Sequence, residues 1–186
     1  MPLYPLHKKY GISRIVVSTY QAVTGTGMRA VEQLMNERKN IKSEPVYPYP
    51  IDLNVIPHIA DFNEEGYTKE EMKMANEGRK ILGHPSLKVS CTCVRVPVYR
   101  SHSVSITAKF SKEPSVEEAR NAFLGKPGIK VMDDPSQKLF PVPLDTTGKD
   151  DCLVGRIRKN LVLENALDLW VVGDQVRKGA ALNAVQ

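Results

Sequence analysis

Residues 103–110 alternate between two kinds of side chain, and this alternation constrains the fold more than any other feature of the sequence. Polar and apolar residues follow one another in the order Ser103, Val104, Ser105, Ile106, Thr107, Ala108, Lys109 and Phe110. Successive side chains of a β-strand point to opposite faces of the sheet. The segment therefore predicts a strand with one apolar and one hydroxyl-rich face. We expect helices on the apolar face, and solvent or a second sheet from a partner subunit on the other.

Further segments predict the rest of a sheet. Short runs rich in β-branched or apolar residues, which are typical of strands, occur at 12–20, 51–59, 154–158 and 167–172. The alternating segment belongs to a longer β signal at 87–111, which Pro97 interrupts. A proline-rich connection at 45–50 precedes the second of these runs. The strands do not alternate regularly with helices, so the pattern predicts an α+β fold with a mixed, mainly antiparallel sheet.

Helix signals lie between these strands. Apolar residues recur at helical spacing from Met28 to about Asn40, after a turn containing two glycines. Thr68 with Glu71 and Ser115 with Glu118 each have the spacing of a capping box, and these helices are expected to reach about 82 and 123. Asp174 is a suitable N-cap for a last helix from 175 onward. A chain of 186 residues suits one domain, and we assign 1–186 to a single domain.

Composition and charge exclude several classes of protein. The net charge of +5 and the pI of about 9.1 raise the question of nucleic-acid binding. The basic residues, however, are dispersed among acidic ones, aromatic residues make up only 6%, and no nucleic-acid-binding motif occurs. No apolar run is long enough to span a bilayer, and the N-terminus does not resemble a secretion signal. We therefore expect a soluble, cytoplasmic protein without nucleic-acid or membrane partners.

The three cysteines predict neither a disulfide framework nor a metal site. Cys91 and Cys93 share one face of an expected strand and cannot easily bridge each other, and Cys152 stands alone. This sparse, odd number fits a reducing compartment. A zinc site would need more thiol or imidazole ligands at closer spacing. We interpret all three as structural residues and predict no metal.

Arg95 and His102 are the first candidates for chemistry. Strand alternation directs Arg95 to the same side as Cys91 and Cys93, where a guanidinium needs a partner, most often a carboxylate held by two hydrogen bonds. The chain turns after Pro97 and reaches His102, the side-chain type best suited to move a proton near neutral pH. The alternative is a structural salt bridge and a surface histidine.

Two further candidates also have simple structural explanations. Glu70 and Lys73 lie three positions apart on one helix face, which is the arrangement of an exposed helical ion pair. Gln21 comes directly after the strand expected at 12–20, and a polar residue at a strand end is often only a turn contact. The residues alone leave both alternatives open.

Five segments in the same order, covering nearly the whole chain, resemble the aspartate-semialdehyde dehydrogenase family. They are VVSTYQAVTGTG (16–27), NVIPHI (54–59), EEMKMANEGRKIL (70–82), RVPVYRSHSVSI (95–106) and LDLWVVGDQVRKGAALNAVQ (167–186). The resemblance implies an α+β domain like the C-terminal domain of glyceraldehyde-3-phosphate dehydrogenase-like enzymes. It also implies a catalytic and dimerisation domain that forms a homodimer through its sheet.

The resemblance implies a role for each candidate residue. His102 becomes the general acid/base, and Arg95, Gln21 and Glu70 become substrate-binding residues. Lys73 corresponds to a phosphate-binding residue, and the positions that touch the cofactor NADP are Thr24, Gly25 and Gln175. The implied reaction is the reversible conversion of aspartate semialdehyde to aspartyl phosphate, in the biosynthesis of lysine, threonine and methionine. A cysteine thiolate attacks the aldehyde, hydride passes to NADP⁺, and phosphate splits the thioester.

The sequence departs from the family pattern in two places. It lacks the Asn-Cys-Ser/Thr turn that carries the nucleophile, and it lacks a glycine-rich dinucleotide-binding motif. Residues 1–10 resemble the tail of the nucleophile's helix, and 175–186 resemble the start of a truncated helix that packs on a missing nucleotide-binding domain. We therefore expect the 186-residue chain to be inactive as a dehydrogenase and not to retain NADP. The alternatives are a domain like that of N-acetyl-glutamyl-phosphate reductase, or a pure dimerisation module.

Overall fold

The centre of the molecule is a six-stranded sheet, seen in a computed structural model that describes residues 1–177. In chain order the strands are β1 (Ile12–Gln21), β2 (Lys88–Arg95), β3 (His102–Phe110), β4 (Ile129–Val131), β5 (Cys152–Lys159) and β6 (Ala166–Gly173). Their spatial order is β2-β1-β3-β6-β5-β4, with β2 and β4 at the edges. The expected strands at 12–20, 154–158 and 167–172 are confirmed within one or two residues, whereas the three-residue β4 was not expected from the sequence.

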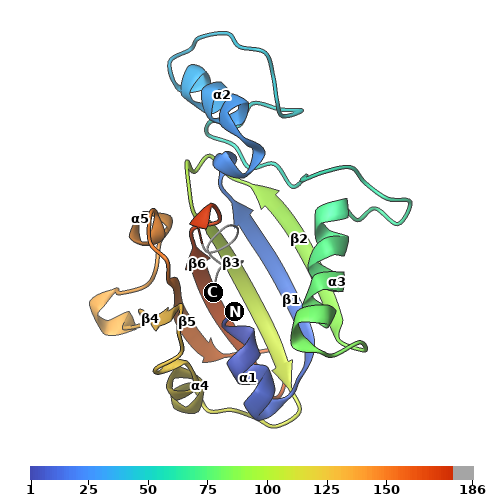
Figure 1. Cartoon of the computed structure of the whole chain (residues 1–186), viewed down its shortest axis with the longest axis vertical. Helices are drawn as coiled ribbons and strands as arrows, with labels where there is room; N and C mark the ends of the chain where they lie inside the picture. The colour runs from blue at the N-terminus through green and yellow to red at the C-terminus, as the bar shows by residue number, and fades with distance from the viewer. Residues whose placement is uncertain (178–186) are drawn as a thin grey trace.

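The sheet is mixed and mainly antiparallel, which confirms the fold class expected from the sequence. β1 pairs with β2 in parallel and β4 with β5 in parallel, whereas the three central pairings, β1–β3, β3–β6 and β6–β5, are antiparallel. Because β1 and β2 run parallel and β3 begins beside the end of β1, three strand termini meet at one end of the sheet. They are the last residues of β1 and β2 and the first residue of β3 (Figure 1).

Three helices among residues 1–177 cover one face of this sheet. They are α1 (Leu3–Tyr10), α3 (Lys69–Leu82) and α4 (Val116–Phe123), and Figure 1 shows them on the near side of the strands. The main core joins Phe123 of α4 and Leu6 of α1 to Ile106, Ala108 and Phe110 of β3. Burying each large apolar side chain stabilises the fold by about 1.5–3 kcal/mol. The apolar face of the alternating segment thus packs against helices, as expected. Both predicted capping boxes are present, at Thr68 and at Ser115.

A second, smaller core forms beyond the edge of the sheet where β1 ends. It joins the 3-10 turn Val23–Thr26 and the helix α2 (Met28–Arg38) to the segment that follows them. The buried side chains of this core are Val23, Ala30, Val31, Leu34, Tyr47, Ile51 and Ile56. Figure 1 shows α2 at the upper end of the molecule, away from the sheet. The predicted helix from Met28 is confirmed and ends at Arg38.

The predicted strand at 51–59 was wrong. Within the described part of the chain, only Ile56 of this segment makes a β-bridge, to Arg95, and its other residues have no ladder partner there. The backbone N–H groups of Ile51 and Asp52 instead donate to the Glu37 carboxylate of α2, at 2.8 and 2.7 Å, and Pro57 has no N–H to donate. A β-branched composition could not reveal that a side chain elsewhere had taken these donors.

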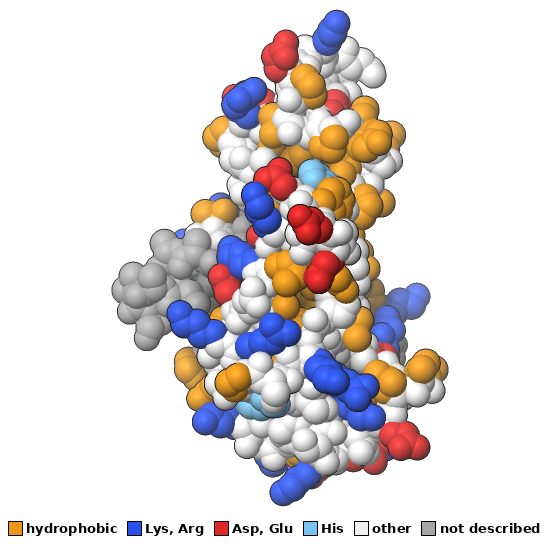
Figure 2. Space-filling view, turned by 90° about the vertical axis from the view of Figure 1, so that its right-hand side faces the viewer, with side chains coloured by type: hydrophobic (Ala, Val, Ile, Leu, Met, Phe, Trp, Pro, Cys, Tyr) orange, Lys and Arg blue, Asp and Glu red, His pale blue; other side chains and the backbone are white. Residues whose placement is uncertain are grey.

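Apolar side chains of the same region remain exposed. Leu53 is 96% exposed, and Val55 and Phe62 are more than half exposed. Hydrophobic side chains gather at the upper end of the molecule in Figure 2. The segment between α2 and α3 is therefore held by polar contacts as much as by burial of its own apolar residues.

The last expected helix is only partly described. The Asp174 carboxylate accepts hydrogen bonds from the backbone N–H groups of Val176 and Arg177, which is the contact expected of an N-cap. Residues 178–186, where that helix was expected to continue, lie outside the described residues. The short helix α5 (Pro143–Thr146) was not expected from the sequence. In the described part of the chain no helix has the length and hydropathy needed to cross a membrane.

Two glycine substitutions should change stability in opposite directions. A Cβ added at Gly155 would lie 2.3 Å from the Met132 carbonyl oxygen, so Gly155→Ala should lower the free energy of unfolding by about 1–3 kcal/mol. At Gly78, within α3, the nearest atom lies 3.9 Å away, at Val89. Gly78→Ala should therefore raise it by about 0.5–1 kcal/mol. Urea unfolding of both variants checks this, and equal effects would contradict it.

Candidate active site

The sheet brings Gln21, Arg95 and His102 together at one end, where β1 and β2 end and β3 begins. Gln21 is the last residue of β1 and pairs in register with Arg95, the last residue of β2. His102 is the first residue of β3, one position before the partner of Tyr20. Arg95 and Gln21 are 5% and 7% exposed. Three residues that lie far apart in the sequence thus become neighbours because β1 is the common partner of β2 and β3.

Both Arg95 and His102 bind the backbone of Ala22, the residue that follows β1. The Ala22 N–H donates to Nδ1 of His102 at 3.0 Å, and Nη1 of Arg95 donates to the Ala22 carbonyl oxygen at 2.6 Å. Because Nδ1 accepts a hydrogen bond, the neutral imidazole carries its proton on Nε2. Nε2 is thus the ring nitrogen that can exchange a proton with a ligand.

The Arg95 guanidinium is buried without a carboxylate partner. No Asp or Glu among residues 1–177 lies within ion-pair distance of it, and its Nε has no hydrogen-bond partner. The ring of Tyr47 lies 5.8 Å from the guanidinium carbon, which offers a weak cation–π contact. Burial lowers the pKa of Arg95, and the charge of Glu70 partly opposes this shift. An anionic ligand would satisfy this cation.

The imidazole of His102 is held neutral at physiological pH. Burial and then the positive charge of Arg95 lower its pKa to about 4, whereas the charge of Asp174 acts in the opposite direction. At pH 7 the ring is therefore an uncharged donor through Nε2–H. A neutral imidazole beside a guanidinium can donate a hydrogen bond to a developing oxyanion without repelling a cation.

The backbone of Gly25 lies beside the Arg95 guanidinium and the His102 imidazole. A Cβ at this position would lie 3.4 Å from Nη1 of Arg95 and 3.4 Å from Nε2 of His102. Its hydrogen thus leaves space in front of the two nitrogens that a ligand would use. Of the three positions that were expected to contact a cofactor, Gly25 is the one that lies directly beside Arg95 and His102.

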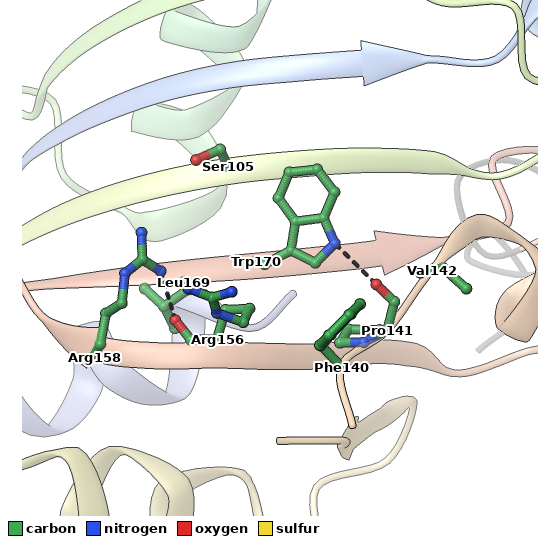
Figure 3. Close-up of a pocket in the computed structure, with 8 residues that line it drawn as sticks. All are labelled: Ser105, Phe140, Pro141, Val142, Arg156, Arg158, Leu169 and Trp170. Carbon is green, nitrogen blue, oxygen red and sulfur yellow. Dashed lines mark hydrogen bonds between the residues drawn. The ribbon is translucent and has the colours of Figure 1, made fainter. Parts of the chain in front are cut away.

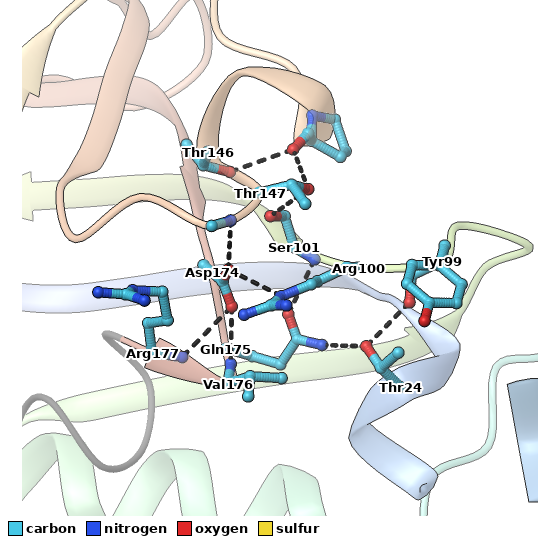
Figure 4. Close-up of polar contacts among 12 residues, drawn as sticks. Thr24, Tyr99, Arg100, Ser101, Thr146, Thr147, Asp174, Gln175, Val176 and Arg177 are labelled. Carbon is cyan, nitrogen blue, oxygen red and sulfur yellow. Dashed lines mark hydrogen bonds and ion pairs between the residues drawn. The ribbon is translucent and has the colours of Figure 1, made fainter. Parts of the chain in front are cut away.

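Thr24 and Gln175, the other two cofactor candidates, contact each other. Nε2 of Gln175 donates to Oγ1 of Thr24, which in turn donates to the Tyr99 carbonyl oxygen at 2.8 Å (Figure 4). Oε1 of Gln175 accepts the Ser101 N–H at 2.8 Å. The side-chain amide of Gln175 therefore already has protein partners on both sides. Any ligand contact by Gln175 would have to share or replace them.

Glu70 and Lys73 are placed differently from the other candidates. They form the expected ion pair on the surface of α3, with Nζ and Oε2 4.0 Å apart, and their side chains are 28% and 58% exposed. Glu70 is near enough to influence Arg95 electrostatically. The contacts of the described residues do not join Lys73 to Arg95 or His102. The structure thus groups Gln21, Arg95, His102 and Gly25 closely, and Lys73 with them only through Glu70.

Sequence reasoning missed a second role of Glu71. Besides capping α3, this buried carboxylate accepts the backbone N–H of Cys93 at 2.8 Å and so fastens α3 to β2 two residues before Arg95. The signal was available: Glu71, Ala75 and Leu82 are spaced so that they share the buried face of the helix. A carboxylate on that face needs a donor from the sheet.

The cysteines fit the structural interpretation. Cys91 and Cys93 are buried thiols whose sulfur atoms lie 3.6 Å apart, and Cys152 is partly buried. The hydrogen bond to Cys93, together with burial, raises the pKa of Cys91 well above its usual range. A thiol held protonated in this way is a poor nucleophile.

Removing the charge of Arg95 should raise the pKa of His102. Arg95→Gln deletes the cation that disfavours the imidazolium, and an NMR pH titration of the ring would show the midpoint move up from about 4. An unfolded histidine titrates near 6.5. Acidification from there to about pH 4 should therefore lower the free energy of unfolding of the native chain, by on the order of 3 kcal/mol at most, and lower that of the variant less. Arg14→Gln, an exposed control on β1, should leave the midpoint in place.

Similarity to known proteins identifies the family of this chain. Residues 3–178 match the family model described as "Semialdehyde dehydrogenase, dimerisation domain". An aspartate-semialdehyde dehydrogenase of Aquifex aeolicus is 49% identical over 99% of this chain and 56% of its own length. The chain thus spans little more than half of the curated relatives that it matches.

Solved structures give the same result. A crystal structure of aspartate semialdehyde dehydrogenase II from Vibrio cholerae, complexed with ASA, superimposes with a TM-score of 0.93 at 38% identity, over all of this chain and 56% of its own. The enzyme with NADP from Candida albicans has a TM-score of 0.69 at 26% identity, over 94% of this chain and 49% of its own. Taken with the sheet and the strand-end site, these matches show that the chain belongs to the semialdehyde dehydrogenase dimerisation-domain family.

Proposed function

We propose that this chain is the substrate-binding and dimerisation part of an aspartate-semialdehyde dehydrogenase. The observation that carries the proposal is the buried Arg95 guanidinium, which forms no ion pair with a carboxylate of the described residues. It lies beside the His102 imidazole because both side chains form hydrogen bonds with the backbone of Ala22. This pairing suits a ligand with an acid group and a carbonyl group a few atoms apart. The relatives named above favour aspartate semialdehyde over an N-acetyl-glutamyl substrate. The pathway would be the synthesis of lysine, threonine and methionine, in the reducing cytoplasm.

In this proposal each side chain has a defined task. Arg95 binds the α-carboxylate of the substrate through two hydrogen bonds, and Glu70 attracts its α-ammonium group. Gln21 contacts the reacting end of the substrate, and Lys73 attracts the phosphate. His102 donates its Nε2 proton to the carbonyl oxygen as the tetrahedral centre forms, and takes it back as the centre collapses. The thiol nucleophile comes from another part of the whole protein, so the 186-residue chain alone is expected to be inactive.

Substrate binding would also adjust the acidity of His102. The positive charge of Arg95 lowers the pKa of the imidazole, so a carboxylate bound to Arg95 would cancel part of that effect. The pKa of His102 would then rise toward neutrality when the substrate is present. Proton transfer would thus become easier in the complex than in the free protein.

Three residues are proposed to contact NADP. Because Gly25 has no side chain, it leaves space beside Arg95 and His102 in which a ring of the cofactor would lie. Thr24 and Gln175, which contact each other, would lie next to this ring. When bound there, NADP supplies hydride transfer. The crystal structure of the related Candida albicans enzyme is one with NADP, which supports this assignment. Because the sequence has no dinucleotide-binding motif, these residues provide only part of the contacts, and tight binding of NADP by this chain alone is not expected.

Binding of L-aspartate semialdehyde to the 186-residue chain tests the proposal. The pKa of His102, followed by NMR, should rise on addition of the ligand, and Arg95→Lys should weaken binding at least about tenfold because an ammonium group cannot form the paired hydrogen bonds. Arg14→Gln serves as the matched control and should bind like the unmodified chain. Equal affinity of the Arg95→Lys variant, or tighter binding of N-acetyl-glutamate semialdehyde, would contradict the proposed substrate.

We further propose that the face of the sheet opposite the helices forms a homodimer. This face carries Ser105, Thr107 and Trp170, and the Trp170 ring contacts that of Tyr20 at 5.4 Å. Beside Trp170 lies a hollow of about 290 Å³ (Figure 3). Its lining residues are Ser105, Phe140, Pro141, Val142, Arg156, Arg158, Leu169 and Trp170. The dimerisation-domain description of the family supports this proposal.

Light scattering of the chain at micromolar concentration should give the mass of a dimer. Ser105→Arg places a bulky charge in the middle of the proposed interface and should produce monomers, because an unpaired buried charge opposes association. Glu77→Arg, on the exposed side of α3, is the control and should remain dimeric. A monomeric unmodified chain, or a dimeric Ser105→Arg variant, would contradict the sheet-face dimer. A dimer that does not bind the semialdehyde would indicate a pure dimerisation module.

A further inference from the structure

Asp174 is a buried carboxylate with an unusually complete set of partners. Its side chain has no exposed surface, and one carboxylate oxygen lies 2.8 Å from Nε of Arg100. This contact has the distance of an ion pair without the geometry of a hydrogen bond. The same oxygen accepts the Gly148 N–H at 2.7 Å, and the other accepts the N–H groups of Val176 and Arg177. Asp174 thus joins the end of β6 to two loops.

The loop that Asp174 holds through Arg100 leads directly into His102. Residue 101 between them is a serine with φ of +74°, a left-handed conformation that costs free energy for a residue with a side chain. Ser101 is 1% exposed, and its hydroxyl meets that of Thr147 at 3.2 Å. The contacts around Ser101 therefore hold the backbone in a conformation that it would not keep by itself.

Asp174 and Gln175 together bind the two segments that fix the position of His102, which are residues 100–101 before it and residues 22–24 after β1. Asp174 pairs with residue 100, and Gln175 binds the N–H of residue 101 and the hydroxyl of Thr24 (Figure 4). Thr24 follows Ala22 by two residues, and Ala22 is the hydrogen-bond partner of the imidazole. Gly173, just before this pair, is the ladder partner of His102. The end of β6 thus fixes the backbone on both sides of the Ala22–His102 hydrogen bond.

We propose that Asp174 is a positioning residue: by holding Arg100 it keeps Ser101 in its left-handed conformation, and so holds the His102 imidazole against the backbone of Ala22. The inference rests on the proposed role of His102 in proton transfer. It adds that the Nε2–H form of the ring depends on an ion pair that does not touch the substrate. Loss of the pair would leave the ring free to turn and to exchange its proton between both nitrogens.

The test uses the ¹⁵N chemical shifts of the His102 ring at neutral pH, together with hydrogen exchange of the Ala22 amide. In the unmodified chain the shifts should correspond to a single Nε2–H form. Asp174→Asn should give a mixture of both neutral forms, and exchange at Ala22 should become about tenfold faster because its hydrogen bond opens more often. Arg100→Gln breaks the same pair from its more exposed side, so it should have the same effect even if Asp174→Asn does not fold.

Asp133→Asn provides a matched control. The Asp133 side chain is only 1% exposed, pairs with Arg120 at 2.7 Å and accepts two backbone N–H groups, at Arg156 and Ile157. Its substitution should lower the free energy of unfolding and leave the His102 signals unchanged. If Arg100→Gln and Asp174→Asn lower stability in the same way without altering the His102 ring or the Ala22 amide, Asp174 has only a structural role. These readouts need no ligand, so they stand apart from the test of substrate binding.

Discussion

The candidate site depends on the two hydrogen bonds made by the backbone of Ala22. Its N–H orients the imidazole of His102 and its carbonyl oxygen orients the guanidinium of Arg95, so one residue fixes the positions of both functional groups. That segment is fixed because β1 is paired on both sides, with β2 in parallel and with β3 antiparallel. Had β2 run antiparallel to β1, the terminus of β2 that carries Arg95 would lie at the opposite end of the strands, away from Gln21. The topology therefore brings these groups together before any side-chain contact does.

Burial gives the same two groups their electrostatic character. A guanidinium that is 5% exposed and a neighbouring imidazole cannot both be positively charged at low cost, and the result is a neutral His102 at physiological pH. The negative charge of Asp174 limits this shift from the other side, and Glu70 does the same for Arg95. The site thus contains one permanent cation and one neutral proton donor, an arrangement suited to a ligand with separate acid and carbonyl groups.

Much of this could be predicted from the sequence, and the remainder has identifiable physical causes. The alternation at 103–110 and the two capping boxes are local signals, and the structure confirms the elements that they predicted. The strand expected at 51–59 was wrong because Glu37, fourteen residues earlier, takes the N–H of Ile51. Arg95 and His102 could be named from their motif, but their common partner could not, because Ala22 contributes only backbone atoms. The Arg100–Asp174 pair was also missed, since its members lie 74 positions apart and the local pattern at Asp174 indicates only an N-cap.

The dependence on Ala22 has a consequence for how such a site can be detected. Methods that find important positions by trimming side chains would pass over residue 22, because it is already alanine and its contribution comes from its amide and carbonyl groups. Its methyl group has no exposed surface, so even a modest enlargement would displace the acid-binding and proton-transferring groups at the same time. A small residue without chemistry of its own can therefore be as restricted in evolution as the two reactive side chains that it aligns.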